Sequence, residues 1–463
     1  MATAMRLSSL IAPDLEKLLD SEPAELQEAL SEIHPEDVAE IVAELPVERA
    51  TAFTQALTPQ AAADVLERLP EDLRVTIVEQ LGPEASAPLV TEMDPDDRAD
   101  LVSELSEEVR EELLARVEAE EPGVAEEVRA LTAYDEESAG GLMTTEFLAL
   151  WPELTVSEAI DEVRVATRER DLETIYYIYV VAYDKLVGVL SLRDLILSDG
   201  DERLSAVMTE QVVSVRVDTD QEEVANTIAR YDLSALPVVD MHNKMLGVVT
   251  VDDVVDVVIN EATEDAHMMA AVVPMEESYL QTGFMDFLRN RITWLIVLFV
   301  GELLTASVMD AYEAQLSAVM DLVIFVPLII SSGGNSGSQS SSLIIRALAL
   351  GELEPADWPK VLLRELAMGV ALGLSLGFVG FARAFVGHGV ENPLAMGITV
   401  SCAIVGVVTL GTLVGSLMPL AIKRVGLDPA VSSTPFVASL VDVFGLVVYF
   451  SIARAVFSVM LPG

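Results

Sequence analysis

Five apolar segments occupy the C-terminal part of the chain, and they constrain the fold more than any other feature. They cover approximately residues 291–311, 318–350, 360–386, 394–424 and 430–461. Each is long enough to cross about 30 Å of hydrocarbon as a helix. Residues 284–463 carry 12 acidic and 9 basic side chains, whereas residues 1–283 carry 64 acidic and 18 basic ones. The sequence therefore predicts a membrane protein with a large, strongly acidic part in water.

The acidic excess also excludes some classes of function. A formal net charge of −49 argues against nucleic-acid binding, which needs clustered Lys and Arg to neutralise phosphates. Cys402 is the single cysteine, so neither a disulfide framework nor a cysteine-based zinc site is expected. The first 17 residues lack the long apolar core of a signal peptide, and we expect the acidic part to lie in the cytoplasm.

The distribution of basic residues predicts the orientation of the spans. With a cytoplasmic N-terminus, only Arg383 and Arg454 fall toward the outside. The basic residues that then fall inside are Arg289, Arg291, Arg346, Lys360, Arg364, Lys423 and Arg424. This positive-inside asymmetry predicts a cell (inner) membrane protein with an extracytoplasmic C-terminus.

Residues 1–135 contain a short repeat. A turn with proline or a polar residue, followed by an acid, recurs about every 12 residues, with prolines at Pro35, Pro46, Pro59, Pro70, Pro83 and Pro95. Proline suits the first turn of a helix, where its missing N–H has no partner to lose. Helices this short are unstable alone and must share a core, so we expect an all-α superhelical solenoid domain.

Residues 136–258 have β/α character and an internal duplication. Met143 and Thr144 recur as Met208 and Thr209, and residues 188–195 match residues 247–254. These two repeats, in order, resemble a tandem CBS-domain pair.

A helix that leaves the second repeat is expected to connect it to the membrane part, within residues 252–283. At 100° per residue, Asp253, Asp256, Asn260 and Glu264 share one face, with Glu261 and Asp265 on its flank. The pattern fits either a solvated acidic face or a stripe that binds cations beside the membrane.

Asp442 lies well inside the fifth apolar segment, where a carboxylate is costly unless it faces water or a partner. The second segment contains a polar run, residues 331–342, rich in Ser and Gly and including Asn335 and Gln339. Such a run cannot face lipid, and it fits either a polar helix–helix seam or a cation path. Carboxylate, amide and carbonyl oxygens suit hard cations such as Mg²⁺, Ca²⁺ and Mn²⁺.

Other features indicate packing rather than chemistry. The spacing of Gly369, Gly373 and Gly377, and of Gly411 and Gly415, is typical of close helix packing. Glu302 and Asp321 are further acids in or near the membrane, with a vestibule role and a structural role both open. No metalloprotease or serine-hydrolase motif is present in the sequence, so we expect no enzyme and no catalytic residues.

Taken in order along nearly the whole chain, these features resemble the MgtE magnesium channels. The most specific matching stretches are residues 139–144, 173–181, 218–225 and 333–340, and residues 428–430 leading to Asp442. The resemblance implies a homodimer in a lipid membrane with the pore between subunits. It also implies a pore built from Asp442, Asn335, Ala438 and Thr434, the last replacing an asparagine found in some members.

The resemblance further implies that cytosolic Mg²⁺ regulates the channel. The implied metal-binding residues are Asp442 in the pore and Asp96, Asp100, Glu222, Asp232, Asp253, Asp256, Glu261, Glu264, Asp265 and Asp428 elsewhere. Some family members bind ATP at the CBS pair, and the matching residues are Tyr176, Arg193 and Asp194.

We therefore expect a multidomain membrane protein with a helical N-terminal domain (1–135), a tandem CBS pair (136–258), a connecting helix and linker (252–283) and a five-helix transmembrane domain (284–463). The predicted function is Mg²⁺ uptake through a channel that cytosolic Mg²⁺ closes. The alternatives are transport of Mn²⁺ or Co²⁺, a non-conducting membrane sensor, and, least supported, a CBS-linked membrane enzyme.

Overall fold

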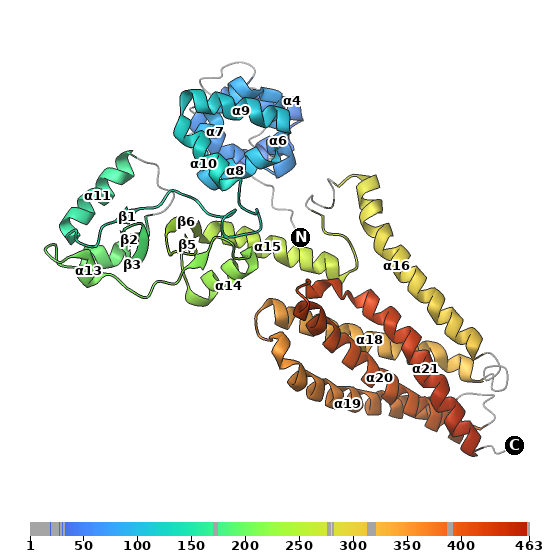
Figure 1. The fold of residues 1–463 in the computed structure, drawn as a ribbon. Coiled ribbons are helices and arrows are strands. Elements are labelled where there is room, and N and C mark those ends of the chain that lie inside the picture. The colour runs from blue at the N-terminus through green and yellow to red at the C-terminus, as the bar shows by residue number, and fades with distance from the viewer. Residues whose placement is uncertain are drawn as a thin grey trace. The chain divides into compact units, whose positions relative to one another are not determined.

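The computed structural model describes residues 19, 27, 30, 33–169, 175–275, 279, 282–312, 321–386 and 392–460. The first 17 residues, and Glu173 and Thr174 of the matching stretch 173–181, lie outside this part of the chain. Contacts group the chain into two compact units, Met1–Val258 and Ile259–Gly463, and each is described by itself (Figure 1).

The first unit begins with short helices, as the proline repeat predicts. They are α3 (Pro35–Glu44), α4 (Val47–Ala56), α5 (Pro59–Leu66), α6 (Glu71–Leu81), α7 (Pro83–Glu92), α8 (Pro95–Glu104), α9 (Glu107–Glu120) and α10 (Pro122–Leu131). Proline occupies the first turn of several of them, and Thr58 caps α5 by accepting a hydrogen bond from the N–H of Ala61 at 3.3 Å.

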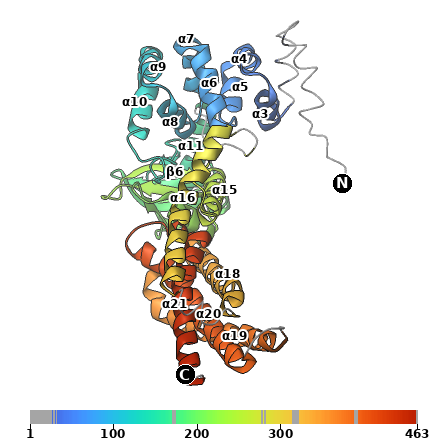
Figure 2. The ribbon, with the colours of Figure 1, turned by 90° about the vertical axis from the view of Figure 1, so that its right-hand side faces the viewer.

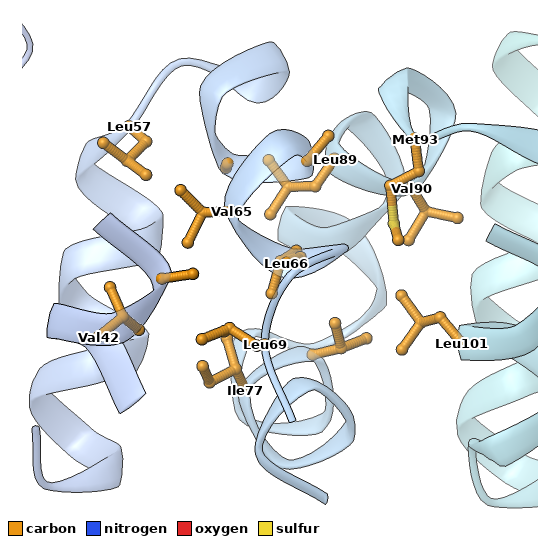
Figure 3. Packing of buried hydrophobic residues seen from close by; sticks show 14 of the residues in the cluster. Val42, Leu57, Val65, Leu66, Leu69, Ile77, Leu89, Val90, Met93 and Leu101 are labelled. Atoms are coloured by element: carbon orange, nitrogen blue, oxygen red, sulfur yellow. The ribbon is translucent and has the colours of Figure 1, made fainter. Parts of the chain in front are cut away.

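Alternate helices of this series pack on each other: α3 on α5, α4 on α6, α5 on α7 and α7 on α9. Their buried side chains, among them Val42, Leu66 and Ile77, form one continuous core (Figure 3). Burying such a side chain stabilises the fold by about 1.5–3 kcal/mol, so the core compensates for helices that are too short to be stable alone. The predicted all-α solenoid is confirmed, and Figure 2 shows the helices in series.

Two small sheets of identical topology follow. The first contains β1 (Ala149–Leu150), β2 (Tyr177–Ala182) and β3 (Lys185–Ser191), with helices α11 (Val156–Glu169), α12 (Leu192–Leu197) and α13 (Leu204–Val207). The second contains β4 (Val215–Arg216), β5 (Ala235–Val239) and β6 (Met245–Thr250), with α14 (Gln221–Tyr231) and α15 (Val251–Met269). In both sheets the first strand runs parallel to the second and the third antiparallel to it. The duplication read from the sequence is therefore a structural one.

The recurring Met-Thr pairs explain how the repeats join. Thr144, before the first sheet, exchanges two backbone hydrogen bonds of 2.9 and 3.0 Å with Val248 of the second sheet. Thr209, before the second sheet, exchanges bonds of 3.1 and 2.9 Å with Val189 of the first. Each repeat thus contributes an extended segment to its neighbour's sheet.

In its described residues, the second unit contains five long helices after α15: α16 (Phe284–Ala311), α18 (Asp321–Ala349), α19 (Trp358–Val386), α20 (Pro393–Arg424) and α21 (Thr434–Met460). Two 3₁₀ turns, η1 (Pro355–Asp357) and η2 (Pro429–Val431), precede α19 and α21. In Figure 2, α18 to α21 lie side by side. Among the described residues, four helices are long and apolar enough to cross a membrane, and α18 is not one of them. The predicted count of five spans therefore remains a prediction, because the polar run lowers the hydropathy of α18.

Glycines set the spacing of this bundle. A Cβ atom added to Gly415 of α20 would lie 2.1 Å from the carbonyl oxygen of Gly337 in α18, and one added to Gly411 would lie 2.4 Å from the carbonyl oxygen of Gly333. Only glycine permits these backbones to come so close. The packing role expected for the small-residue spacings is the one the structure gives them.

Candidate pore and cation-sensing sites

The polar run of α18 faces the first turns of α21. The hydroxyl of Ser338 donates to the carbonyl oxygen of Thr434 at 3.2 Å, and that of Ser341 donates to the carbonyl oxygen of Ser432 at 3.1 Å. These bonds fix the polar run of α18 against the first residue of α21 and the turn that precedes it. Part of the polar run is therefore a helix–helix seam, the simpler of its two readings.

Asp442 lies two turns into α21, next to the glycines of the polar run. A Cβ atom added to Gly334 would lie 3.5 Å from the Cβ of Ala438 and 3.7 Å from Oδ1 of Asp442. Gly334 thus leaves space beside the carboxylate, which is half-buried in the single chain. The structure brings together Asp442, Ala438 and the polar run, which the sequence links only through their positions in two separate apolar segments.

The other two predicted pore residues occupy different positions. Asn335 is exposed on α18, and its amide nitrogen donates to Ser331 Oγ at 3.4 Å. The hydroxyl of Thr434 donates to the carbonyl oxygen of Met269, the last residue of α15, at 3.1 Å. Thr434 therefore ties the start of α21 to the end of the connecting helix. Asp321 begins α18, away from the turn that holds Asp442.

In the first unit, half-buried acids gather around one arginine. The guanidinium of Arg74 lies 2.8 Å from Glu104 Oε1 and 3.7 Å from Asp97 Oδ1. Six acids that interact with Arg74 or with one another are here called the Arg74 cluster: Glu67, Asp94, Asp97, Asp100, Glu104 and Asp253. Glu71 and Glu136 add further negative charge near Asp100. A carboxylate oxygen from each of Glu67, Asp94 and Asp97 lies within 4.8 Å of the other two.

The pKa values of this cluster are raised mainly by burial, and the charges of neighbouring acids add to the effect. Burial, with the charges of Glu67 and Asp253, raises the pKa of Asp97 to about 8. Burial raises the pKa of Asp100 and of Asp253 to about 6 and that of Glu104 to about 7, although Arg74 acts in the opposite direction on Asp100 and Glu104. Closely spaced carboxylate oxygens with excess negative charge are the arrangement that a hard divalent cation neutralises.

Glu67, Asp94, Asp97 and Glu104 of this cluster are absent from the set predicted from the sequence. A signal was available, because Asp97, Asp100 and Glu104 follow one another at helical spacing on α8. Asp96, which the resemblance selected, is buried on α8, and its role as a ligand stays a prediction.

A second group of acids lies in the other unit. Burial, then the charges of Asp428 and Glu261, raise the pKa of Asp265 to about 6, against the effect of Lys423. Asp428 begins η2, where its Oδ1 accepts a hydrogen bond from the N–H of Ala430 at 2.8 Å. The structure thus brings together three residues of the predicted set, two from α15 and one from the loop before α21. Glu264 lies half-buried on α15, and Asp256 is exposed there, close enough to Asp253 to repel its charge.

Glu222 and Asp232 lie at opposite ends of α14. Glu222 is in its first turn, and Asp232 ends it in the left-handed conformation, with φ of 51°. A helix of this length is about 16 Å long, so the two side chains cannot share one ion within a subunit. Their metal-binding role stays a prediction.

The three predicted nucleotide-binding residues lie at one edge of the first sheet. The carbonyl oxygen of Tyr176 accepts from the N–H of Leu192 at 2.9 Å, which places Tyr176 beside Arg193 and Asp194 at the start of α12. All three are exposed, and Ser191 Oγ donates to Asp194 Oδ2 at 2.6 Å. Together they form an accessible edge with a positive charge, a negative charge and an aromatic ring.

Comparisons with known proteins agree with this architecture. Residues 33–137 match the MgtE intracellular N domain, residues 139–199 and 204–260 match CBS domains, and residues 326–452 match MgtE, a divalent cation transporter. The magnesium transporter MgtE of Thermus thermophilus is 44% identical over 72% of this chain and 73% of its own. The chain belongs to the MgtE family. The MgtE of Enterococcus faecalis is 38% identical over 71% of both chains.

Two solved structures of soluble parts of magnesium-transport proteins are also similar to this family member. The soluble part of a magnesium transporter covers 55% of this chain and 99% of its own, with 34% identity and a TM-score of 0.51. The cytosolic domain of the Mg²⁺ channel MgtE, solved with ATP, covers 53% and 99%, with 41% identity and a TM-score of 0.50. This family member is thus a multi-pass membrane protein with an MgtE N domain and a CBS pair before its apolar helices.

Proposed function

We propose that this protein is a Mg²⁺ channel that mediates magnesium uptake. The observation that carries the proposal is Asp442, a carboxylate two turns into an apolar helix, beside the space left by Gly334 and one turn from Ala438. Mg²⁺ dehydrates reluctantly, so it would pass with bound waters held by Asp442, by the amide of Asn335 and by the carbonyl oxygen of Ala438. The names of the relatives support magnesium as the ion.

The proposed assembly is a homodimer in the inner membrane with a cytoplasmic N-terminus and an extracytoplasmic C-terminus. Two copies of Asp442 then face one axial pore and concentrate cations there. An inside-negative potential supplies about 2.3 kcal/mol per charge per 100 mV, hence about 4.6 kcal/mol for a divalent ion. This force is sufficient for uptake without a coupled chemical reaction, and we infer that the protein is not an enzyme.

Cytosolic Mg²⁺ would close the channel by binding the acids outside the membrane. Without the ion, the Arg74 cluster and the group of Glu261, Asp265 and Asp428 hold unbalanced charge. A bridging ion removes this repulsion and therefore binds more tightly when the acids are close together. Gating needs such a difference in Mg²⁺ affinity between the closed and the open arrangement. The bond from Thr434 to Met269 links the end of α15 to the pore helix and gives this change a path to Asp442.

ATP is proposed as a second ligand of the cytosolic part. The support is the accessible edge that holds Tyr176, Arg193 and Asp194, together with the ATP complex of the similar cytosolic domain. An aromatic ring and a guanidinium suit an adenine base and phosphates, respectively.

The deciding experiment is Mg²⁺ flux into proteoliposomes that contain the full-length protein. Asp442→Asn keeps the shape of the side chain and removes its charge, so flux should fall at least 100-fold while the dimer still assembles. Wild-type rates in the variant would remove Asp442 from the pore. Competition with Mn²⁺ and Co²⁺ in the same assay separates the proposed substrate from other divalent ions, and absence of any flux would favour a sensor.

A further inference from the structure

Glu302 is a second intramembrane carboxylate that the proposed pore does not yet use. It follows 18 residues after the start of α16, in a segment with a mean hydropathy of 2.0. A charged group at this depth is costly in lipid, and such residues face a partner or a water-filled path. The contacts of Glu302 therefore decide which of these applies.

Glu302 lies against the face of α21 that carries Asp442. Its Oε1 accepts a hydrogen bond from the hydroxyl of Ser439 at 3.3 Å. Ser439 precedes Asp442 by three residues, so both are on one face of the helix. The carboxylate of Glu302 is close enough to Asp442 for the two charges to repel each other.

The way the helices pack makes this contact possible. Gly301 lies next to Ser439, because a Cβ atom added there would be in ordinary van der Waals contact with the Cβ of Ser439, at 3.7 Å. The α16 helix packs on α21, and only 6% of its most apolar stretch is buried within the chain. The side chain of Glu302 remains exposed in the subunit. A single hydroxyl is a weak partner for an ionised carboxylate, so the rest of its hydrogen bonds must come from water or a cation.

We propose that Glu302 lines the ion path beside Asp442, where its charge increases the occupancy of hydrated divalent cations and their preference over monovalent ones. The inference rests on the proposed channel function and adds a residue to it. Glu302 and Asp442 come from different helices and together provide two carboxylates per subunit. Hydrated Mg²⁺ is held through its waters, so a carboxylate need not touch the metal to contribute.

The test measures Mg²⁺ flux and the Mg²⁺/Na⁺ permeability ratio of full-length Glu302→Gln in proteoliposomes. Glutamine keeps an oxygen that can accept from Ser439 and removes only the charge. We expect the external Mg²⁺ needed for half-maximal flux to rise at least threefold and the permeability ratio to fall. High salt screens charges, so the difference from the wild type should shrink in concentrated choline chloride. A purely structural Glu302 would give none of these changes.

Two variants serve as controls. Asp310→Asn removes an exposed acid from the same helix, eight residues later, and should behave as the wild type. Ser439→Ala removes the hydrogen bond and keeps the charge of Glu302, so the half-saturating concentration should stay within twofold of the wild-type value. If Ser439→Ala had the larger effect, or if Glu302→Gln matched the wild type, the inference would be wrong.

Failure of the inference and failure of the channel proposal give different results. Wild-type flux that disappears in Asp442→Asn and persists unchanged in Glu302→Gln overturns only the role of Glu302. No Mg²⁺ flux in the wild type overturns both. If Glu302→Gln did not assemble, Glu302→Asp would decide, because it keeps the charge. A permeability ratio in Glu302→Asp equal to that of the wild type supports the inference, and a lower ratio contradicts it.

Discussion

The two units of the molecule treat their carboxylates differently. In the first unit, six acids gather around Arg74, and burial raises the pKa of Asp97 to about 8. In the apolar helices, Asp442 and Glu302 are close to each other, and neither has an ion pair among the described residues. The first arrangement stores repulsion that a cation can relieve, which suits a sensor. The second leaves a few charges available to a passing ion, which suits a conduction path.

The comparison is tested most strongly by removing acids from the sensor alone. The combined variant Asp97→Asn, Asp100→Asn and Asp253→Asn eliminates most of the repulsion in the Arg74 cluster. We expect the internal Mg²⁺ concentration that halves flux to rise about tenfold, because fewer negative charges remain to attract the ion. The maximal flux should stay unchanged. Flux in proteoliposomes loaded with graded Mg²⁺ measures both quantities.

The matched control neutralises three acids on the exposed surface of the same unit, Glu111, Glu112 and Glu120 of α9. These substitutions change the net charge equally and should leave inhibition as in the wild type. Equal inhibition in the two triple variants would mean that the Arg74 cluster is only a structural feature.

A smaller effect is expected from removing the arginine. Arg74→Met leaves Glu104 and Asp97 without their compensating charge. In Mg²⁺-free buffer this should lower the free energy of unfolding by about 2 kcal/mol. The loss is smaller than that expected for breaking a fully buried ion pair, because the two acids can take up protons. Thermal unfolding of the full-length protein measures the change, and added Mg²⁺ should reverse part of it. Arg116→Met removes the exposed pair with Glu84 and should cost at most about 0.5 kcal/mol. If Arg74→Met and Arg116→Met lowered the stability equally, Arg74 would not compensate the charges of the Arg74 cluster more than an ordinary surface arginine does.

The smallest effect is a dependence on pH. The pKa of Asp97 is higher in the folded protein than in the unfolded chain, where it is near 4. Its contribution to stability is therefore complete below about pH 4 and is lost as the pH rises through about 8. Asp97→Asn, which resembles the protonated acid, should melt with the wild type below about pH 4 and roughly 2–4 °C above it at pH 9 without Mg²⁺. This is the shift expected for about 1 kcal/mol, a small value because solvent screens the partly exposed Asp97.

Asp218→Asn provides the opposite case. The Arg216 guanidinium beside Asp218 holds the pKa of that exposed carboxyl below its usual range, so neutralising it removes a weak favourable pair and cannot raise the melting temperature at pH 9. A gain in Asp218→Asn as large as that in Asp97→Asn would show that net charge, and not the Arg74 cluster, controls the pH response.

Much of the architecture could be predicted from local patterns. The proline repeat indicates α3 to α8 because proline at the first turn is a local signal, and the duplication indicates the two sheets. The position of Asp442 in an apolar segment made it a candidate because burial of charge is costly anywhere in a membrane. Its contact with Gly334 depends on how α18 packs on α21, and no pattern within one segment encodes that.

The acids of the Arg74 cluster, which we propose as cation sensors, were harder to select. In a chain with 76 acidic residues, sequence spacing alone does not distinguish Asp97 from Asp96. The distinction comes from tertiary structure, since Asp97 lies beside Glu67, Asp94 and Arg74, which belong to other turns of the solenoid or precede α8. The contact of Glu302 with Ser439 is equally non-local, because the two residues lie 137 positions apart.

The exchange of Thr144 and Thr209 between the two sheets has a consequence for cooperativity. Each repeat completes its hydrogen bonding with a segment that belongs to the other, so neither can unfold or shift without breaking bonds in its neighbour. The pair must therefore respond to a ligand as one body. A nucleotide held at the edge near Tyr176 would then stabilise the sheet from which α15 emerges, even though it touches only the first repeat.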